Sequence, residues 1–591
     1  MAQTVEKPLR AGPALSTIGG LWQQAVDAGR SRAAFLVRED GGWREVSWAE
    51  AAGRVSALAN GFLAAGIRKG DKVSILCRTR LEWTLVDYAL ATIGGIVIPI
   101  YPTSSPAEIE YILRDSETKV LISEDAEQLG KTAPYEAGLP ALERVIGIDE
   151  AGSGGTLADV EAAGHSHAAE HPDALREAAA QVGLEDVLTF LYTSGTTGNP
   201  KGCVLSQRNY AAMVDSVMTV ENLFRDDDTV LLFLPLAHNF SRLVQFLGAS
   251  VGFTLAYCAD VRHVSTALME VRPTLFPSVP RVYEKVHTAV KAAAAEGGAV
   301  KRRIAEWAFA VGERKVKGAS GPLFALQARL ADSLVLSKVR ARMGGRMRFA
   351  VSGGAPLAPE IAEFFGACGV VILEGYGMTE CTTAATMNRP GAHRFRTVGP
   401  ALPGVELRID TDGEILIRGE NVFGGYYRNP EATAEALTED GWLRSGDIGA
   451  IDEHGHLAIT DRKKDILVTA GGKNVSPQVI ENALKVSPYI SQALVVGDNR
   501  PYVAALITVD RDEIKGLGAP DSAEVRAAIE QAVAAVNLDL GRVEQIKRFT
   551  ILPRDFSAEE GEITPTLKLK RRICVEHFRD EVEHLYAESR T

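Results

Sequence analysis

Apolar residues recur at helical spacing over residues 47–67, and Gly70 and Asp71 then turn the chain into a short apolar run at 73–76. The same order of helix and strand recurs further along, at residues 85–100, 106–122 and 145–148. Strands that alternate with helices of this length predict a mostly parallel sheet covered on both faces. A second series of the same kind spans 186–373, so the predicted fold class is α/β with two layered sheets.

The pattern changes after Pro400 to short strands separated by turn signals, at residues 405–410, 413–418, 446–451 and 457–460. This is typical of a small antiparallel, barrel-like subdomain. A compact α+β module is predicted beyond it, with a helix beginning at Ser476-Pro477, strands at 493–497 and 502–509, and a helix at 524–535. The charged junction between them is typical of an exposed linker. We predict an N-terminal domain at 1–460, a hinge at 461–465 and a C-terminal domain at 466–591.

Residues 151–182 are rich in Gly, Ala and His and show no sustained period, which predicts a loop and a crossing helix. Three histidines lie there, His165, His167 and His171. No cysteine is near them, and the acidic neighbours fall at no recognised ligand spacing. We interpret them as solvated loop residues rather than metal ligands.

The composition is that of an ordinary globular protein of two or more domains, with 591 residues, 46% apolar and 24% charged. The longest nearly apolar stretch, 88–101, is shorter than the roughly 20 residues that a membrane-spanning helix needs. The N-terminus lacks the apolar core of a secretory signal, and the six cysteines show no CxxC spacing. We predict free thiols, no zinc site and a cytoplasmic location.

The net charge of −12 argues against a dedicated nucleic-acid-binding protein. One stretch departs from this balance, because residues 281–348 contain 15 basic and 5 acidic side chains. A solvated face of long helices and a docking surface for an anionic lipid or cofactor both account for such a stretch. We hypothesise a weak peripheral contact with anionic membranes.

An apolar strand at 188–191 leads into the loop YTSGTTGNPKG, residues 192–202. Glycines let a backbone wrap an anion, hydroxyl and N–H groups donate to its oxygens, and a lysine neutralises charge. The spacing is not that of a Walker loop, because Asn199 and Pro200 separate Gly198 from the lysine. The predicted phosphate-binding residues are Thr193, Ser194, Gly195, Thr196, Thr197, Gly198 and Lys201.

This loop resembles the signature of the adenylate-forming superfamily of acyl-CoA synthetases, adenylation domains and luciferases. Further motifs follow in the family's order: SGGAPL at 352–357, EGYGMTE at 374–380, TVG at 397–399, GWLRSGDIG at 441–449, DRKKD at 461–465, TAGGKNVSP at 469–477 and TPTLKLKRR at 564–572. The resemblance extends over nearly the whole chain. The long basic helical stretch and the TPTLKLKRR ending resemble the long-chain fatty acid branch most.

The resemblance implies that a medium- to long-chain fatty acid and ATP form an acyl-adenylate and pyrophosphate, and that the thiol of CoA then takes the acyl group. ATP, Mg²⁺ and CoA are the implied cofactors and co-substrate. A fatty acyl-AMP ligase that serves a carrier protein is the alternative, although no carrier or reductase domain follows. A fold that only senses ligands, and a membrane scaffold, explain fewer of the motifs. The oligomeric state stays open.

The resemblance also implies roles around the reacting groups. Lys568 matches the mobile catalytic lysine, with Lys570 as an alternative, and it would screen the repulsion between carboxylate and α-phosphate. Thr379 would donate to the α-phosphate, and Glu380 would hold Mg²⁺. His238, in LPLAHNF, would lie beside the acyl carboxylate. Long-chain members commonly carry an acidic residue three places later, where this chain has Ser241.

The nucleotide and the tail receive the remaining expected roles. The adenine slot would consist of Gly353, Gly354, Ala355, Pro356, Glu374, Gly375, Tyr376 and Gly377. Tyr376 would stack on the base, although a core aromatic is an equal reading of that residue alone. Asp447 and Arg462 would bind the ribose. The C-terminal domain would rotate about Lys464 to present Gly471 and Gly472 to the pantetheine arm, and a plain hairpin turn is the alternative for that glycine pair.

Overall fold

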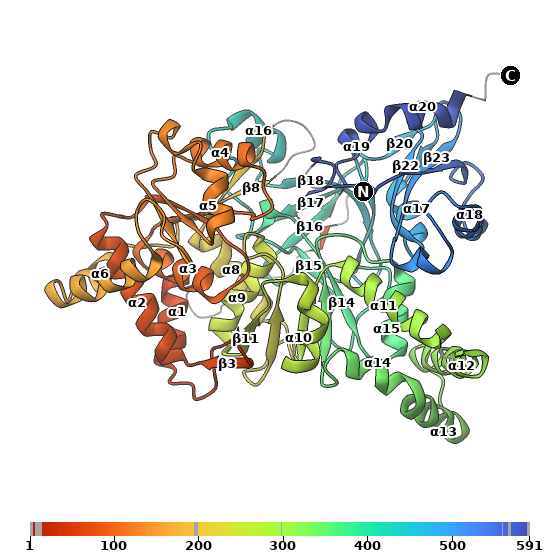
Figure 1. The fold of residues 1–591 in the computed structure, drawn as a ribbon, viewed down its shortest axis with the longest axis horizontal. Helices are drawn as coiled ribbons and strands as arrows, with labels where there is room; N and C mark the ends of the chain where they lie inside the picture. Colours follow the sequence, from red (N-terminus) through yellow and green to blue (C-terminus); the bar gives the residue numbers. More distant parts are fainter. Residues whose placement is uncertain are drawn as a thin grey trace.

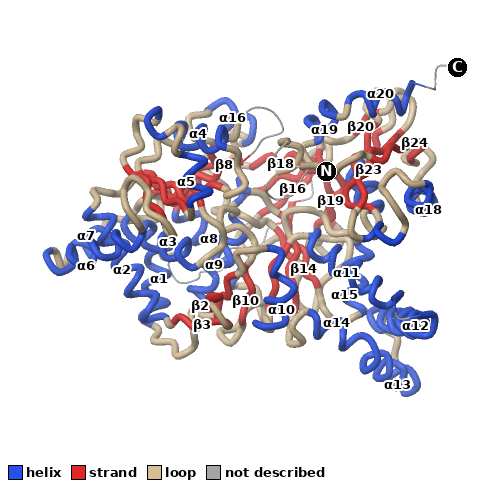
Figure 2. Tube along the Cα trace, viewed as in Figure 1, coloured by secondary structure: helices blue, strands red, loops and turns tan. Residues whose placement is uncertain are grey.

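The computed structural model describes residues 4–5, 15–193, 199–296, 298–557, 560–564 and 569–587. Two large sheets and a smaller one make up the part before residue 461, and a separate small sheet with its own helices follows (Figures 1 and 2). The predicted α/β class is confirmed. Within the described residues, no helix combines the length and the apolar character needed to cross a membrane.

The first large sheet has six strands in the order β7-β6-β4-β5-β8-β9. Their bounds are Arg144–Gly147, Val120–Ser123, Lys72–Leu76, Ile96–Ile100, Val187–Thr193 and Lys201–Ser206. All neighbours are parallel except β8 and β9, which form an antiparallel hairpin. The helices of this region are α2 (Trp48–Ala64), α3 (Leu81–Ile93), α4 (Pro106–Asp115) and α5 (Ala126–Thr132). The predicted alternation of helix and strand is therefore confirmed over this part of the chain.

The second large sheet has eight strands in the order β15-β14-β13-β12-β10-β11-β2-β3. Their bounds are Thr386–Met387, Ile372–Tyr376, Phe349–Ser352, Leu275–Ser278, Thr229–Leu232, Thr254–Tyr257, Phe35–Glu39 and Gly42–Val46. The six inner strands are parallel and the two edge strands antiparallel. The pattern of the chain did not predict β2 and β3. They precede the whole first sheet in sequence and join the second.

Helices flank and connect the strands of the two large sheets. Before and between the strands lie α1 (Ile18–Asp27), α8 (Gln207–Met218), α9 (Asn239–Val251), α10 (Val264–Val271) and α15 (Pro359–Ala367), and α16 (Pro430–Ala436) follows the last strand of the two large sheets in sequence. A longer helical excursion between β12 and β13 consists of α11 (Pro280–Glu296), α12 (Gly298–Val316), α13 (Pro322–Ala331), a π-helical turn (Asp332–Leu336) and α14 (Ser337–Arg342). It carries the basic stretch.

Residues 151–182 correct one prediction, because they form α6 (Leu157–Glu170) and α7 (Ala174–Ala180) rather than a loop with one helix. The reason lies in a close approach of α6 to α2. A Cβ at Gly164 would lie 1.8 Å from the Ala57 carbonyl oxygen, so only glycine allows this contact. The contact buries no large apolar side chain of α6 at that point, and the sequence therefore shows no strong period.

The three histidines of this segment lie on α6 or at its C-terminal end rather than in a loop. His165 and His167 are on α6, and His171 ends it. His165 and His171 are exposed, whereas His167 is half-buried and its Nδ1 lies 3.1 Å from Oδ1 of Asn60. No group of three potential metal-binding His, Cys, Asp or Glu side chains exists among the described residues.

The small sheet has the order β1-β16-β17-β18-β19, with bounds Thr4–Val5, Glu406–Ile409, Glu414–Arg418, Leu443–Ile451 and Leu457–Arg462. Every neighbouring pair is antiparallel, as predicted. The described pairings run linearly from β1 to β19. This element is thus a sheet with two edges, one of them supplied by the N-terminal strand.

The C-terminal part contains a sheet of order β22-β23-β24, with bounds Ile490–Val496, Val503–Val509 and Ile546–Ile551. The helices are α17 (Pro477–Leu484), α18 (Ala523–Leu538), α19 (Arg571–His577) and α20 (Arg579–Ala587), and a short hairpin joins β20 (Leu467–Val468) to β21 (Asn474–Val475). The predicted α17, β22, β23 and α18 are confirmed. The strand β24, which pairs in parallel with β23, had no predicted counterpart.

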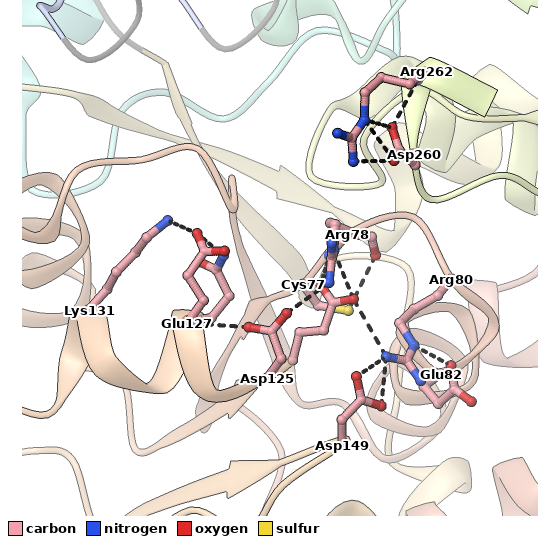
Figure 3. Close-up of polar contacts among 12 residues, drawn as sticks. Cys77, Arg78, Arg80, Glu82, Asp125, Glu127, Lys131, Asp149, Asp260 and Arg262 are labelled. Carbon is pink, nitrogen blue, oxygen red and sulfur yellow. Dashed lines mark hydrogen bonds and ion pairs between the residues drawn. The ribbon is translucent and has the colours of Figure 1, made fainter. Parts of the chain in front are cut away.

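An ion-pair network ties the carboxyl ends of β4, β6 and β7 together (Figure 3). Arg78 pairs with Glu124 at 3.0 Å, and Arg80 pairs with Asp149 at 2.8 Å. Between them Thr79 donates to the carbonyl oxygen of Leu234 at 2.7 Å. The ion pairs thus join strand ends within the first sheet, and the Thr79 hydrogen bond joins the segment after β4 to the segment after β10 of the second sheet.

All six cysteines are buried, and none forms a disulfide.

Candidate active site

A cavity of about 900 Å³ opens where the carboxyl ends of the second sheet meet the β8–β9 hairpin, α9 and the C-terminal part. Its lining combines two kinds of residue. The polar and glycine part of the lining includes Thr193, Lys201, Gly353, Gly354, Gly375, Gly377, Thr379, Glu380, Glu414, Arg444, Arg462, Lys463, Lys464, Asp465, Thr564 and Lys570. The apolar part includes Val217, Phe224, Val230, Leu243, Val244, Leu247, Leu275 and Pro277. One cavity therefore presents both cationic groups and apolar surface.

The predicted phosphate loop connects the two strands of the β8–β9 hairpin. Thr193 pairs with Lys201 across that hairpin, and both side chains line the cavity. The loop residues between them, Ser194, Gly195, Thr196, Thr197 and Gly198, lie outside the described residues. A hairpin connection also differs from a Walker loop, which leads from a strand into a helix.

Thr379 and Glu380 sit in a short turn after β14, and both line the cavity. Glu380 is buried, and its Oε1 accepts a hydrogen bond from the Tyr426 hydroxyl at 2.7 Å. Gly377 permits the turn, because a Cβ there would lie 2.2 Å from the Thr383 carbonyl oxygen. With substrate phosphates beside it, the Glu380 carboxylate would fit Mg²⁺, which commonly takes one or two carboxylates together with substrate phosphates and water.

The predicted adenine slot divides between residues on the cavity wall and residues behind it. Gly353, Gly354, Gly375 and Gly377 line the cavity. The lining does not include Ala355, Pro356, Glu374 or Tyr376. Ala355 and Pro356 are exposed on the turn after β13. Burial raises the pKa of Glu374 to about 7, against a small opposing effect of the Leu357 amide.

Tyr376, Asp447 and Arg462 form a hydrogen-bonded group. Asp447 on β18 lies directly opposite Arg462 on β19. The Arg462 Nε donates to Oδ1 of Asp447 at 3.1 Å, and the Tyr376 hydroxyl donates to Oδ2 at 2.8 Å. Burial, together with the adjacent carboxylate, raises the pKa of Tyr376 well above its ordinary value. Arg462 reaches the cavity, so the structure brings the two predicted ribose residues together at its edge.

His238 is the N-cap residue of α9 and lines the cavity. Its Nδ1 accepts a hydrogen bond from the Phe240 amide at 3.2 Å, so the neutral ring carries its proton on Nε2. Ser241, where the family commonly has an acid, is fully buried and does not line the cavity. The position at which this chain differs from the common long-chain pattern therefore lies on the buried side of α9.

One buried ion pair behind His238 escaped the sequence analysis. Arg242 on α9 and Asp87 on α3 are both completely buried, with Nη2–Oδ1 and Nε–Oδ2 distances of 2.5 and 2.9 Å. Gln245 donates to the same carboxylate at 2.8 Å. Burial lowers the pKa of Arg242, but the effects of Asp87 and Tyr210 together outweigh burial and raise this pKa above its ordinary value. The pair joins the helix that carries His238 to a helix of the first sheet.

Three residues of the C-terminal part line the cavity: Thr564, Leu569 and Lys570. Lys568 lies outside the described residues, between two of these neighbours. Gly471 and Gly472 are exposed in the β20–β21 hairpin and are not part of the cavity wall. Of the described C-terminal residues, Thr564, Leu569 and Lys570 line the cavity, whereas the predicted pantetheine loop does not.

The junction residues Lys463 and Lys464 also reach the cavity. Lys463 was predicted only as part of an exposed linker, yet it pairs with Asp412 at 2.6 Å and with Glu414 at 2.9 Å. These carboxylates hold it on the small sheet and raise its pKa. Lys464 is the first junction residue after this anchor.

A sequence profile described as "AMP-binding enzyme" matches residues 21–427, and one described as "AMP-binding enzyme C-terminal domain" matches residues 464–590. The chain belongs to the AMP-binding enzyme family. It is 40% identical over 566 residues to a protein of Mycobacterium bovis named "Long-chain-fatty-acid--CoA ligase FadD15", with 93% of each chain covered. It is 31% identical over 596 residues to "Long chain acyl-CoA synthetase 7, peroxisomal" of Arabidopsis thaliana, covering 93% of this chain and 83% of the relative.

Solved structures show that the fold is the adenylate-forming one. The adenylation domain of a carboxylate reductase from Mycobacterium chelonae matches with a TM-score of 0.78 at 25% identity, covering 98% of this chain and 92% of that one. The ATP-bound MatB from Rhodopseudomonas palustris matches with a TM-score of 0.71 at 24% identity, covering 96% and 100%. The predicted membership of the adenylate-forming superfamily, close to its long-chain fatty acid branch, is confirmed.

Proposed function

We propose that this protein activates medium- to long-chain fatty acids with ATP and transfers the acyl group to CoA, releasing AMP and pyrophosphate. The observation that supports this most directly is one cavity whose lining combines lysine, arginine and glycine residues with a group of apolar side chains, and that also includes His238. A fatty acid has the same division, an anionic head on an apolar chain. The names of the most similar relatives agree with this substrate class.

The first half-reaction brings two anions together, because a carboxylate oxygen attacks the α-phosphorus while pyrophosphate leaves. Lys201 and Arg462 line the end where the phosphates would lie, and we assign Lys568 to the gap between carboxylate and α-phosphate. Thr379 would donate to a phosphate oxygen. When bound, Mg²⁺ would neutralise phosphate charge, and Glu380 would hold it.

The second half-reaction needs a path for the CoA thiol, whose sulfur attacks the acyl carbonyl carbon as AMP leaves and the thiol proton is lost. In this structure the C-terminal segment at 569–570 lines the cavity. We propose that the C-terminal domain, residues 466–591, rotates about the hinge at 461–465. Such a rotation would withdraw that segment and bring Gly471 and Gly472 forward.

The decisive experiment measures pyrophosphate release and thioester formation across fatty acids of graded chain length, with and without CoA. Release that depends on a long acyl chain, with thioester formed when CoA is present, is the expected result. Pyrophosphate release that leaves acyl-adenylate unconsumed in the presence of CoA would instead identify a fatty acyl-AMP ligase. Pyrophosphate release that does not depend on acyl chain length would contradict the role assigned to the apolar lining residues.

Phe224 offers a direct test of the role proposed for the apolar lining residues. It lines the cavity and packs against Phe253, with ring centroids 5.5 Å apart. Phe224→Trp should shift the preferred acid to a shorter chain, lowering kcat/KM about fourfold for each methylene excluded, since a buried methylene contributes about 0.8 kcal/mol. Met218→Trp is the matched control, because Met218 is exposed and does not line the cavity. The same length profile in both variants would exclude Phe224 from the acyl site.

A cytoplasmic location and the contact of residues 281–348 with anionic membranes also remain proposals.

A further inference from the structure

Residues 423–427, between β17 and α16, join the turn that carries Glu380 to the hairpin strand β9. Near one end of this segment the Phe423 amide donates to the Glu380 carbonyl oxygen at 2.8 Å. Further along, Tyr426 forms an antiparallel bridge with Cys203 of β9. The segment therefore lies against both the turn that carries the expected Mg²⁺ ligand and the strand that follows the predicted phosphate loop.

The Tyr426 side chain contacts a functional group from each of these elements. Its hydroxyl donates to Oε1 of Glu380 at 2.7 Å, and the Lys201 Nζ lies 5.3 Å from the centroid of its ring. All three side chains line the cavity. The polar tip of one aromatic residue thus meets a carboxylate, while the face of its ring attracts an ammonium group.

Glu380 has few other groups to orient it. Its side chain is buried, and among the described residues it forms no ion pair. The Cys203 thiol also lies beside this carboxylate, but a thiol is a weak donor. The Tyr426 hydroxyl is therefore the strongest donor to the carboxylate among the described side chains. One accepted hydrogen bond leaves a carboxylate further lone pairs for a cation.

We propose that Tyr426 is a positioning residue for the metal–nucleotide complex: its hydroxyl orients the Glu380 carboxylate toward Mg²⁺, and its ring supports Lys201. The inference rests on the proposed function, because it takes the phosphates of ATP to bind at these residues. Removing a group that hydrogen-bonds a metal-binding carboxylate typically weakens metal affinity by about ten- to a hundredfold. Tyr426 itself touches neither the metal nor the reacting atoms in this proposal.

Equilibrium binding of an ATP analogue tests the proposal without turnover. The probe is α,β-methylene-ATP, which cannot be cleaved next to its α-phosphate, and calorimetry compares its affinity in saturating Mg²⁺ with that in EDTA. Tyr426→Phe keeps the ring and removes only the hydroxyl. It should weaken binding of the Mg²⁺ complex about tenfold and leave binding of the metal-free analogue unchanged. Binding of the Mg²⁺ complex as tight as in wild type would overturn the proposal.

A second variant and a matched control separate the ring from the segment as a whole. Tyr426→Leu also removes the ring, so it should weaken binding of the metal-free analogue about threefold, and no change there would overturn the role assigned to the ring. Tyr427→Phe is the control, because its ring stacks on Phe190 with centroids 4.4 Å apart and does not line the cavity. It should bind both forms like wild type. The same loss in the control would overturn the proposal, since it would reflect a general disturbance of the segment.

A double-mutant cycle shows whether Tyr426 acts through Glu380. In a Glu380→Gln background, Tyr426→Phe should weaken binding of the Mg²⁺ complex no further, because the hydroxyl then orients a side chain without the metal-binding charge. A further tenfold loss would overturn the proposed route. Wild type that bound neither form of the analogue would refute the proposed function and this inference with it. Wild type that bound both, with Tyr426→Phe indistinguishable from it, would refute this inference alone.

Discussion

The buried pair of Asp87 and Arg242 makes the sharpest prediction about stability. Both side chains are completely buried, and the carboxylate accepts two hydrogen bonds from the guanidinium and one from Gln245. Asp87→Asn keeps the size of the side chain but removes its charge. Arg242 then remains as a buried cation without a counter-ion, and an amide N–H₂ group faces the guanidinium or Gln245 in place of an acceptor.

Removing one partner of a buried pair typically costs 3–5 kcal/mol, and we expect about 4 kcal/mol for Asp87→Asn because all three hydrogen bonds meet at this carboxylate. The double variant Asp87→Leu with Arg242→Met should recover most of that loss. It removes both charges and returns apolar surface to a site beside Trp83, Tyr210 and Phe246. The pair would thus act in specifying how α9 packs on α3 more than in adding net stability.

Urea unfolding followed by tryptophan fluorescence is suited to this measurement, because all six tryptophans precede residue 461 and report on the large domain alone. Glu110→Gln is the matched control, since Glu110 pairs with Arg114 at 2.7 Å on the surface of α4. It should cost no more than about 0.5 kcal/mol. A cost below about 1 kcal/mol for Asp87→Asn, or a double variant as unstable as the single one, would refute the reasoning.

Three further outcomes follow from the site and the C-terminal domain. Lys568→Ala should abolish adenylate formation yet spare thioester formation from supplied acyl-adenylate, and equal loss of both would refute its role. Lys464→Pro should spare adenylate formation and slow thioester formation, because proline restricts the hinge beside the anchored Lys463. Normal thioester turnover in this variant would exclude that hinge. Glu562 is fully buried between Arg554 and His577, and hydrogen bonds from both partners, outweighing burial, lower its pKa to about 2. Its contribution is present above its ordinary pKa and is lost as the pH falls through about 2, so Glu562→Gln should destabilise the C-terminal domain at neutral pH and flatten that acid dependence in circular dichroism.

The elements that the sequence predicted best are those with a clean local pattern. The helix α2 starts directly after the N-cap Ser47, whose hydroxyl accepts from the Glu50 amide, and the four-residue apolar run after it became β4. Strand partners were harder, because pairing joins distant segments. The strands β2 and β24 are such cases, because β2 pairs with β11 of the second sheet and β24 pairs with β23. The local sequence pattern does not indicate which distant strand each one pairs with.

The site shows the same division between local and distant information. Short motifs predicted which residues would gather, and the cavity does bring together Thr193, Glu380 and Arg462 from three separate elements. Asp87 and Arg242 carry no such motif and lie 155 residues apart. Charged residues most often lie at the surface, so the sequence gives no sign that these two are buried. Only the packing of α3 on α9 shows that the two neutralise each other.

The packing of the C-terminal part bears on the proposed rotation. Its main core cluster is built from residues 467–546 and contains no side chain of the large domain. Hydrogen bonds across the boundary include Arg281 donating to Ser491 at 3.0 Å and Ser476 donating to the Thr460 carbonyl at 3.1 Å, and Val486 adds an apolar contact with the core of the large domain. Each such hydrogen bond contributes about 1 kcal/mol net, whereas separating an apolar core would cost far more. The proposed rotation at Lys464 would therefore break these hydrogen bonds and the Val486 contact while leaving the C-terminal core intact, and Lys463, held by Asp412 and Glu414, would stay with the large domain.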